Sequence, residues 1–416
     1  MEENIKRDVV VIGGGPAGMA AALRATEEGA DVLLVERDEE LGGILQQCIH
    51  NGFGIELYEE ELTGPEYAHR FIDDVWGESI DVALRTFVIS LSPDRRLKLL
   101  GPEGLVTVEA GAVVLATGAR ERTRGEVRLP GTRPSGVMTA GTAQSFINKR
   151  GYMPGEKVLI LGSGDIGLIM ARRLTWEGAE VVGVAELMSY PTGLNRNVVQ
   201  CLHDFDIPLH LSHTVTDIYG KNRVQGLQLS PVDDELKPLP EEGREIDCDT
   251  LLLSVGLIPE NEFFKEAGVE LDSRTRGPRV DGWFQTNVPG IFGCGNAVHI
   301  EDLVDWVTLD GYRAGEGAAR FAADKGLPQA DREILAGKNV DYVVPHEVSL
   351  EDPFRIALRV DKPLEGVWIK IEGTEVSFPR RIVTPGEMEV QDIDGQDLAA
   401  LEDLEKIEVS VTERGG

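Results

Sequence analysis

A short apolar run that ends in three spaced glycines lies near the start of the chain and most constrains its fold. Residues 9–18 read Val-Val-Val-Ile-Gly-Gly-Gly-Pro-Ala-Gly, so a buried strand leads directly into the pattern Gly13-x-Gly15-x-x-Gly18. In such a pattern the first glycine allows a tight turn, the second lets the backbone approach a pyrophosphate, and the third lets the next helix pack on the strand. The helix expected over 16–28 would direct its positive N-terminal end at those phosphates.

An acidic residue follows at the position that this kind of turn requires. The next apolar segment, residues 31–35, reads as a second strand and ends at Glu36. A carboxylate about 20 residues beyond the glycines can accept hydrogen bonds from a ribose diol. The context therefore predicts a dinucleotide-binding turn, and the alternative is an ordinary strand-turn-helix unit.

The same arrangement begins again near the middle of the chain. A strand at 158–161 precedes Gly162-Ser-Gly164-Asp-Ile-Gly167, and the strand after the next helix ends at Glu186. Two copies in one chain are far more specific than one. A carboxylate at Glu186 repels a 2′-phosphate and accepts a hydrogen bond from a free 2′-hydroxyl, which favours NAD(H) over NADP(H). Arg196 lies near enough in sequence to reach a phosphate, so it weighs against this preference.

Three further segments place small residues after buried strands. They are Ala112-Val-Val-Leu-Ala-Thr-Gly118, Thr250-Leu-Leu-Leu-Ser-Val-Gly256 and Ile291-Phe-Gly-Cys-Gly-Asn296. Beyond residue 339 the chain carries short alternating runs separated by Pro and Gly, which is typical of a small all-β module. We therefore predict an α/β fold with two Rossmann-like dinucleotide-binding domains, the second inserted into the first, and a C-terminal β module.

Charge and cysteine content exclude several functions. The formal net charge is −31, and such a surface repels both nucleic acid and anionic membranes. The N-terminus lacks an apolar segment of signal-peptide length and no apolar run approaches a bilayer span, so we expect a cytoplasmic protein without a membrane span. The four cysteines lie far apart in the sequence, so we expect neither a redox dithiol nor a metal site.

With both glycine patterns and the Gly293-Cys-Gly-Asn296 segment in view, residues 8–325 resemble the two-dinucleotide-binding-domain flavoproteins of the thioredoxin and glutathione reductase superfamily. The resemblance implies an FAD-binding domain at 1–123 and 256–335, an NAD(H)-binding domain at 124–255, and a separate module at 336–416. Asn296 stands where this superfamily commonly has an aspartate, and an amide can still accept the same hydrogen bond. The redox dithiol of the superfamily is absent.

The resemblance also implies which residues contact each cofactor. For FAD they are Gly13, Gly15, Pro16, Ala17, Gly18, Glu36, Arg37, Gly43, Ala116, Thr117, Gly118, Gly295 and Asn296. For NAD(H) they are Gly162, Gly164, Asp165, Ile166, Gly167, Glu186 and Gly256.

A narrower resemblance rests on the loop 43–54, the run 295–306 and the C-terminal module. These segments resemble the NAD(FAD)-dependent dehydrogenases associated with glycerol-3-phosphate dehydrogenase and, more distantly, the flavin subunits of hydrogen cyanide synthase, opine oxidase and sarcosine oxidase. This resemblance implies a subunit of a hetero-oligomer that exchanges hydride with NAD. Its partners would be a dehydrogenase flavoprotein that oxidises glycerol 3-phosphate and a small cysteine-rich electron-transfer protein.

Several single residues leave alternatives open. We expect Cys48 and His50 to lie near the isoalloxazine and act there, but Cys48 can equally be a buried thiol that fills its loop, and His50 a structural histidine. We expect His299 and Asp302 to cap the helix that follows them. Two functions remain: a competent NADH:acceptor oxidoreductase or NADH oxidase, and a flavin scaffold that turns over only when docked to a partner.

Overall fold

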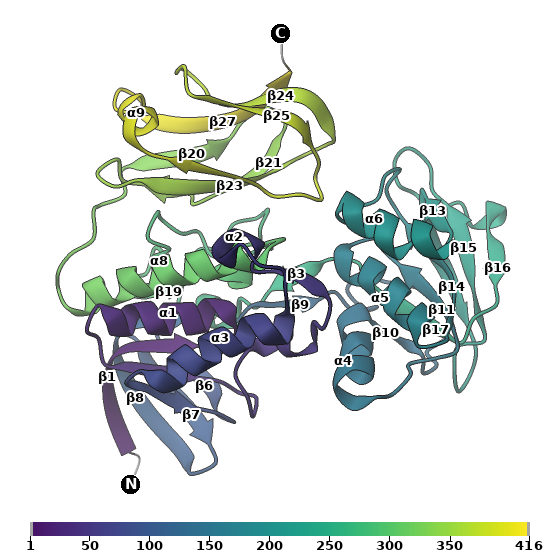
Figure 1. Ribbon diagram of the computed structural model, residues 1–416, viewed down its shortest axis with the longest axis horizontal. Helices are drawn as coiled ribbons and strands as arrows, with labels where there is room; N and C mark the ends of the chain where they lie inside the picture. The colour runs from purple at the N-terminus through teal and green to yellow at the C-terminus, as the bar shows by residue number, and fades with distance from the viewer. Residues whose placement is uncertain (1–2, 414–416) are drawn as a thin grey trace. The chain divides into compact units, whose positions relative to one another are not determined.

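The computed structural model describes residues 3–413, which form two compact units. The first unit comprises the chain up to Ala119 together with the chain from Pro259 onward, and the second comprises Arg120–Ile258. Each unit contains a β-sheet with a core of parallel strands and helices packed on it (Figure 1). The predicted α/β class with two Rossmann-like sheets is confirmed.

The sheet of the first unit is centred on β1 and has the order β5-β2-β1-β8-β7-β6, with β19 also paired to β8. Strands β5, β2, β1, β8 and β19 are parallel, whereas β7 and β6 return antiparallel as the alternating sequence there predicts. The strand bounds are β1 Glu3–Ile12, β2 Val32–Val35, β5 Ile80–Ala83, β6 Phe87–Leu91, β7 Arg96–Gly101, β8 Gly104–Leu115 and β19 Ile291–Gly293.

Three helices cover one face of this sheet: α1 (Pro16–Glu27), α3 (Gly64–Gly77) and α8 (Val304–Ala322) (Figure 1). Side chains alternate along β1, so Val9 and Val11 pack under these helices while Val10 and Ile12 pack on the opposite face. The segments between these strands and helices contain six short elements: η1 (Gly43–Gln47), β3 (Asn51–Phe53), α2 (Ile55–Tyr58), β4 (Leu62–Thr63), α7 (Glu262–Glu266) and η4 (Gly295–Ala297).

Helices α1 and α8 pack backbone against backbone. A Cβ atom on Gly311 would lie 2.3 Å from the carbonyl oxygen of Ala17, and one on Gly315 would lie 2.3 Å from that of Ala21. These two glycines of α8 therefore meet the small residues of α1 with no side chain between the helices. The contact brings together the helix after the first glycine turn and the helix after the Gly295 turn.

The C-terminal part of the first unit is the predicted all-β module, with one short helix. Its core contains Ile356, Leu358, Val367, Ile369 and Val409, which are all fully buried. The two sheets have the orders β22-β20-β27-β24-β25 and β21-β23-β26. The bounds are β20 Arg332–Ala336, β21 Val340–Val344, β22 Glu347–Val348, β23 Phe354–Val360, β24 Leu364–Ile371, β25 Ser377–Val383, β26 Glu389–Ile393, α9 Gly395–Ala399 and β27 Lys406–Glu413.

The second unit repeats the strand-turn-helix plan in a parallel sheet of order β10-β17-β11-β12-β13. A three-stranded antiparallel sheet of order β14-β15-β16 completes it. The strands are β10 Val137–Thr139, β11 Lys157–Leu161, β12 Glu180–Glu186, β13 Leu209–Leu211, β14 His213–Tyr219, β15 Gly226–Pro231, β16 Arg244–Ile246 and β17 Thr250–Leu253. The helices are α4 Ala140–Arg150, α5 Asp165–Trp176, α6 Asn195–Cys201, η2 His203–Phe205 and η3 Pro240–Glu242.

Two short paired strands, β9 (Ala119–Glu121) and β18 (Leu257–Pro259), carry the chain out of the first unit and back into it. No helix within the described residues is both long enough and apolar enough to cross a lipid bilayer.

Candidate functional site

The first glycine turn has the geometry that its sequence predicts. Gly13 has φ of 108°, and a Cβ atom there would lie 2.3 Å from the carbonyl oxygen of Ala116 on the neighbouring strand. A Cβ atom on Gly18 would lie 1.8 Å from the carbonyl oxygen of Gly13, so the helix packs closely on the turn. At Gly15, by contrast, no described atom beyond its chain neighbours lies within 4 Å of the Cβ position. The turn thus leaves open space at the glycine that is expected to approach a pyrophosphate.

Helix α1 begins immediately beyond this open space. Gly15 is its N-cap and Pro16 its first residue, and among the described residues no side chain caps this end. The first turn also carries no acidic side chain. The N–H groups of the first turn and the positive end of the helix dipole are therefore available to an anion such as a pyrophosphate.

Glu36 lies at the end of β2, beside the same turn. Its side chain is buried, and its two carboxylate oxygens accept hydrogen bonds from the backbone N–H groups of Gly14, at 2.6 Å, and Asp38, at 2.8 Å. Arg37, the next residue, is exposed. Because β1, β2, β8 and β19 are parallel, their carboxyl ends meet at one edge of the sheet, where nucleotide sites of this fold form.

The strand β8 and the Gly295 turn contribute the other predicted residues at this edge. After β8 come Ala116, Thr117 and Gly118, of which Thr117 donates its hydroxyl to the carbonyl of Glu260 at 2.9 Å. Gly118 has φ of 69°. After β19, Gly295 has φ of 60°, and a Cβ atom there would lie 2.9 Å from Val307 and 3.1 Å from Ala17.

Asn296 keeps its side-chain oxygen inside the chain. Its Oδ1 accepts a hydrogen bond from the backbone N–H of Glu301 at 3.0 Å, which closes the loop between β19 and α8.

The loop 43–54 borders the glycine turn before α1 at its start and is bound to α8 at its end. A Cβ atom on Gly43 would lie 3.1 Å from Cα of Gly15, so the start of the loop borders the first glycine turn. At its end, the buried carboxylate of Asp305 on α8 accepts hydrogen bonds from the N–H groups of Gly54, at 3.2 Å, and Leu57, at 3.1 Å. The sequence does not predict this role of Asp305, because a carboxylate on a distant helix gives no local signal.

Cys48 and His50 occupy the same loop in different surroundings. Cys48 is buried, and its thiol donates to the carbonyl of Ile44 at 3.3 Å. Burial raises the pKa of this thiol to about 12, so it stays protonated near neutral pH. His50 is partly exposed, and its Nδ1 lies 3.1 Å from the carbonyl oxygen of Asn51 while its ring packs on Phe53 with ring centroids 5.0 Å apart.

The second glycine turn repeats the first with tighter packing. Gly162 has φ of 98°, and its Cβ atom would lie 2.0 Å from the carbonyl oxygen of Ser254; a Cβ atom on Gly167 would lie 2.7 Å from Cβ of the same serine. The Ser254 hydroxyl accepts a hydrogen bond from the N–H of Gly167 at 3.1 Å. At Gly164 the nearest atom to the Cβ position is again this hydroxyl, at 3.3 Å. Ser254 therefore fixes the turn from the adjacent strand.

The acidic residues of the second turn are both engaged. Glu186 is buried and accepts hydrogen bonds from the N–H of Ser163 at 2.9 Å, the hydroxyl of Ser163 at 2.6 Å and the hydroxyl of Thr192 at 3.2 Å. Asp165, the first residue of α5, accepts hydrogen bonds from the N–H of Leu194 and the side chain of Asn197.

Two other predicted residues complete the second site. Ile166 is partly buried in the first turn of α5. Gly256 has φ of 95° and accepts a backbone hydrogen bond from Arg122 at 2.9 Å.

The predicted capping of α8 is wrong. The N-cap is Leu303, which makes no side-chain hydrogen bond to the helix. Asp302 instead forms an ion pair with Arg359 of the β module and accepts the N–H of Met388, because these groups satisfy a carboxylate that is largely buried.

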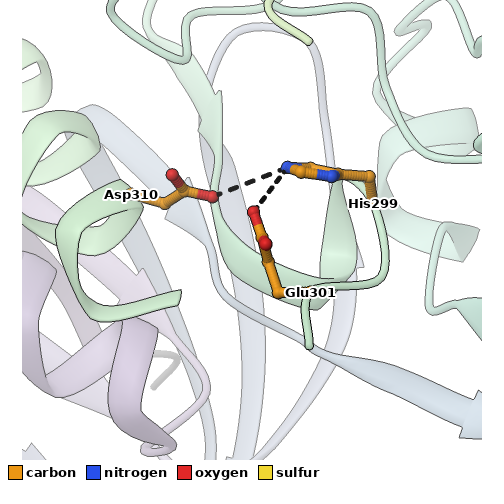
Figure 2. Close-up of side chains that lie close together, drawn as sticks. All are labelled: His299, Glu301 and Asp310. Atoms are coloured by element: carbon orange, nitrogen blue, oxygen red, sulfur yellow. Dashed lines mark ion pairs between the residues drawn. The ribbon is translucent and has the colours of Figure 1, made fainter. Parts of the chain in front are cut away.

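His299 does not cap the helix either, because its imidazole faces Glu301 and Asp310 (Figure 2). Its Nε2 lies 2.9 Å from Oε1 of Glu301 and 3.9 Å from Oδ2 of Asp310. Burial, and then the neighbouring Glu301 carboxylate, raise the pKa of Asp310 to about 8. The sequence does not predict this cluster, because Asp310 lies in the second turn of α8 and meets His299 only in the folded chain.

Comparisons with known proteins agree with this architecture. The sequence profile of the family described as pyridine nucleotide-disulphide oxidoreductase matches residues 7–319. The chain is similar to one of the subunits of opine oxidase from Agrobacterium tumefaciens, with 28% identity over 79% of this chain and 66% of that protein. It is also similar to the HcnB component of hydrogen cyanide synthase from Pseudomonas protegens, with 27% identity over 79% of this chain and 71% of that protein. The chain thus spans just under two thirds of the first relative and somewhat more of the second.

Among solved structures, thioredoxin reductase of Lactococcus lactis has the same fold, with a TM-score of 0.63 and 23% identity over 76% of this chain and 99% of that chain. The profile match covers both glycine turns and the Gly295 segment, and the family it defines consists of FAD-dependent oxidoreductases of NAD(P)H. The chain belongs to the pyridine nucleotide-disulphide oxidoreductase family.

Proposed function

We propose that this chain holds FAD at the first glycine turn and NAD(H) at the second, and that it passes electrons between NAD(H) and a partner protein. The observation that carries the proposal is the open space at Gly15 in front of the uncapped N-terminus of α1. A methyl group at this position would displace no described protein atom, and a pyrophosphate placed here would meet the uncapped N–H groups of α1. In FAD the flavin ring supplies the hydride chemistry, so the chain's task is to bind, orient and exclude water.

The residues fit FAD at both ends of the first site. At the pyrophosphate end they are Gly13, Gly15, Gly18 and the carboxylate of Glu36, and at the flavin end they are Gly295 and Asn296. Glu36 is held by the N–H groups of Gly14 and Asp38, which leaves its oxygens at the end of β2 where a ribose diol would donate to them. The hydrogen bond from Glu301 orients the amide of Asn296.

The second site favours NAD(H) over NADP(H). The Glu186 carboxylate is fixed by Ser163 and Thr192 at the end of β12, where a 2′-phosphate would meet its negative charge. Arg196 is exposed at the start of α6 and is the side chain that would favour NADP(H) instead.

Electron transfer to a partner protein is supported by the spacing of the cysteines and by two relatives of this chain. All four cysteines are buried, and none lies at the short sequence spacing of a redox dithiol. The opine oxidase and hydrogen cyanide synthase relatives are both subunits of larger enzymes. We propose that this chain is likewise one subunit of a hetero-oligomer. Its partner would be a dehydrogenase flavoprotein of the glycerol-3-phosphate dehydrogenase type, the partner implied by the sequence resemblance, with a small cysteine-rich protein as mediator.

We propose Cys48 and His50 as the side chains of the loop 43–54 that lie beside the flavin in place of a dithiol. The support is that this loop borders Gly15 at one end and α8 at the other. Cys48 would lie there as a neutral thiol, since burial raises its pKa to about 12. His50 is the partly exposed titratable side chain of the pair.

We propose three domains. Residues 1–123 and 256–335 would bind FAD, residues 124–255 would bind NAD(H), and residues 336–416 would form the C-terminal module. The support is that the chain changes unit at Ala119 and Pro259, close to these limits. We also propose a cytoplasmic location, because buried cysteines without disulphides suit a reducing compartment.

Rapid mixing of the purified, FAD-loaded protein with NADH tests the function. The expected result is loss of the oxidised-flavin absorbance near 450 nm within seconds, faster with NADH than with NADPH. A protein that binds FAD but keeps this absorbance in excess NADH would contradict the hydride exchange and favour the scaffold function. Rapid turnover with oxygen or a dye, with no gain from any co-purified protein, would favour the stand-alone NADH:acceptor reductase.

A further inference from the structure

Three side chains that the proposed function does not use converge in the interior of the first unit: His299, Glu301 and Asp310 (Figure 2). One nitrogen or oxygen atom from each lies within 4.8 Å of those from the other two. His299 is 1% exposed, and the side chains of Glu301 and Asp310 are 2% and 11% exposed. The cluster therefore joins an imidazole and two carboxyl groups almost out of contact with water.

Four polar atoms of this cluster make no hydrogen bond of acceptable geometry within the described part of the chain. Among the residues that the structure describes, no group makes such a bond to either ring nitrogen of His299, to Oε2 of Glu301 or to Oδ2 of Asp310. Buried polar atoms are nearly always satisfied, and leaving one without a partner costs about 1–3 kcal/mol. Four such atoms in one place indicate a ligand that the protein chain itself does not supply.

The nearest arginines do not fill that role, because each is bound elsewhere. Arg359 pairs with Asp302 and also donates to the hydroxyl of Tyr342 and to the carbonyls of Ile300 and Pro385. Arg355 pairs with Asp392 through two hydrogen bonds. Neither of these two arginines pairs with Glu301 or Asp310, and the described side chain that faces both carboxylates as an ion-pair partner is His299.

We propose that His299, Glu301 and Asp310 bind a divalent first-row transition-metal ion. One imidazole nitrogen and two carboxylate oxygens form a ligand set that suits Zn²⁺, Fe²⁺ or Mn²⁺, and a charge of +2 compensates two buried carboxylates. A four-coordinate ion with bonds of about 2.1 Å separates its ligand atoms by about 3.4 Å. The observed separations of 2.9 Å and 3.9 Å from His299 Nε2 bracket that value.

Three protein ligands leave at least one coordination position for water or a small molecule. The cluster lines a cavity of about 540 Å³, whose wall also includes Trp306, Tyr312, Arg313 and Pro345. A small ligand of the metal would therefore have space in this cavity. All three ligands lie outside both glycine turns, and the backbone N–H of Glu301 donates to Asn296 of the proposed FAD site.

Zinc titration of the untagged full-length protein, after removal of metals with a chelator, tests the site. The variants are Glu301→Gln and His299→Gln, and the matched control is Asp394→Asn, an exposed acid that lines the same cavity. Calorimetry and elemental analysis after desalting should give one Zn²⁺ per chain for the wild type and the control. Affinity should fall at least about tenfold in both ligand variants, since even outer partners of metal ligands change it that much.

Two results would overturn the proposal. The first is a wild-type protein that binds no Zn²⁺ at equimolar concentration, and the second is equal affinity in wild type and both ligand variants. If His299→Gln does not fold, the absorption spectrum of Co²⁺ bound to the wild type decides. Intense visible bands support a four- or five-coordinate protein site, whereas the weak spectrum of aqueous Co²⁺ contradicts it.

Discussion

A Cβ atom on Gly18 would lie 1.8 Å from the carbonyl oxygen of Gly13, whereas one on Gly15 would meet no described atom within 4 Å. Two glycines of one turn therefore have separable roles. Gly18 allows the helix to pack on the strand, and Gly15 leaves room for a ligand.

This difference predicts that one alanine substitution weakens FAD binding and the other lowers the stability of the fold. Gly15→Ala should retain the wild-type melting temperature of the FAD-free protein, because its backbone is extended and its added methyl enters open space. It should bind FAD at least about tenfold more weakly, since the methyl lies where the pyrophosphate would bind. Gly18→Ala should destabilise the fold by about 2 kcal/mol or more through overpacking. Thermal unfolding and FAD titration separate the two. Equal FAD affinity in Gly15→Ala and wild type would contradict the site.

Glu186 should set the choice between NADH and NADPH. Glu186→Gln removes the negative charge that a 2′-phosphate would meet, so the ratio of NADPH to NADH reduction rates should rise several-fold. Glu180→Gln is the matched control, since it changes an exposed acid at the opposite end of the same strand. Flavin reduction by each nucleotide gives the ratio. If the ratio of NADPH to NADH reduction rates changes equally in Glu186→Gln and Glu180→Gln, Glu186 does not set the choice of nucleotide.

Cys48 should contribute little as an ionised nucleophile. Because burial raises its pKa to about 12, the thiolate is a minor species at neutral pH. In Cys48→Ser, NADH should therefore reduce the flavin at a rate within about twofold of wild type. A nucleophilic role for Cys48 would require the thiolate, which is scarce at this pH. His50→Gln, measured in parallel, tests the second side chain of the loop. A loss of a hundredfold in Cys48→Ser alone would make the thiol a participant.

Asp281 should make the protein less stable as pH rises. Burial raises its pKa from 3.8 to about 6, although the N–H groups of Trp283 and Gln285 donate to it. The folded state therefore binds this proton more tightly than the unfolded state. Its stabilising effect is complete below pH 4 and is lost as pH rises through 6, amounting to about 3 kcal/mol.

Asp281→Asn should remove that dependence. The variant should gain stability relative to wild type between pH 4 and pH 7, as measured by urea unfolding at both values. Asp73→Asn, an exposed aspartate on α3, provides the comparison. A difference between Asp281→Asn and wild type that is the same at both pH values would refute the assignment.

The ion pair between Arg359 and Asp302 should stabilise the contact of the β module with the loop before α8. Both side chains are largely buried, so Arg359→Met leaves an uncompensated carboxylate and should cost about 3–5 kcal/mol. The double variant Arg359→Met, Asp302→Asn should recover part of this loss. Unfolding free energies of the four proteins in the cycle measure the coupling, and strict additivity would argue against it.

Local patterns in the sequence predicted the parts of this protein that depend on local structure. The two glycine turns, the acids at the ends of β2 and β12, and the alternating strands of the C-terminal module follow from spacing and periodicity. Each of these features needs specific residues at fixed separations, so a single sequence is enough to predict it. The resemblance then connected them to a flavoprotein family, which the profile match confirms.

Contacts between distant segments could not be predicted in this way. Asp305 reaches the loop 54–57, and Asp302 reaches Arg359, across 57 residues or more. His299 and Asp302 were therefore predicted as caps, the common role for a polar side chain just before a helix. Their actual partners depend on how the β module and α8 fold together, and no spacing rule in the sequence encodes that arrangement.

The backbone contact of α8 with α1 has a consequence for ligand binding. Gly311 and Gly315 lie against Ala17 and Ala21, so the helix beside the pyrophosphate and the helix beyond Gly295 are held at a spacing set by main-chain atoms. The spacing of these two helices at the proposed FAD site is therefore set by main-chain contact before any ligand binds. Little conformational entropy is lost on binding, and a bulkier residue at either glycine would alter the length of the site.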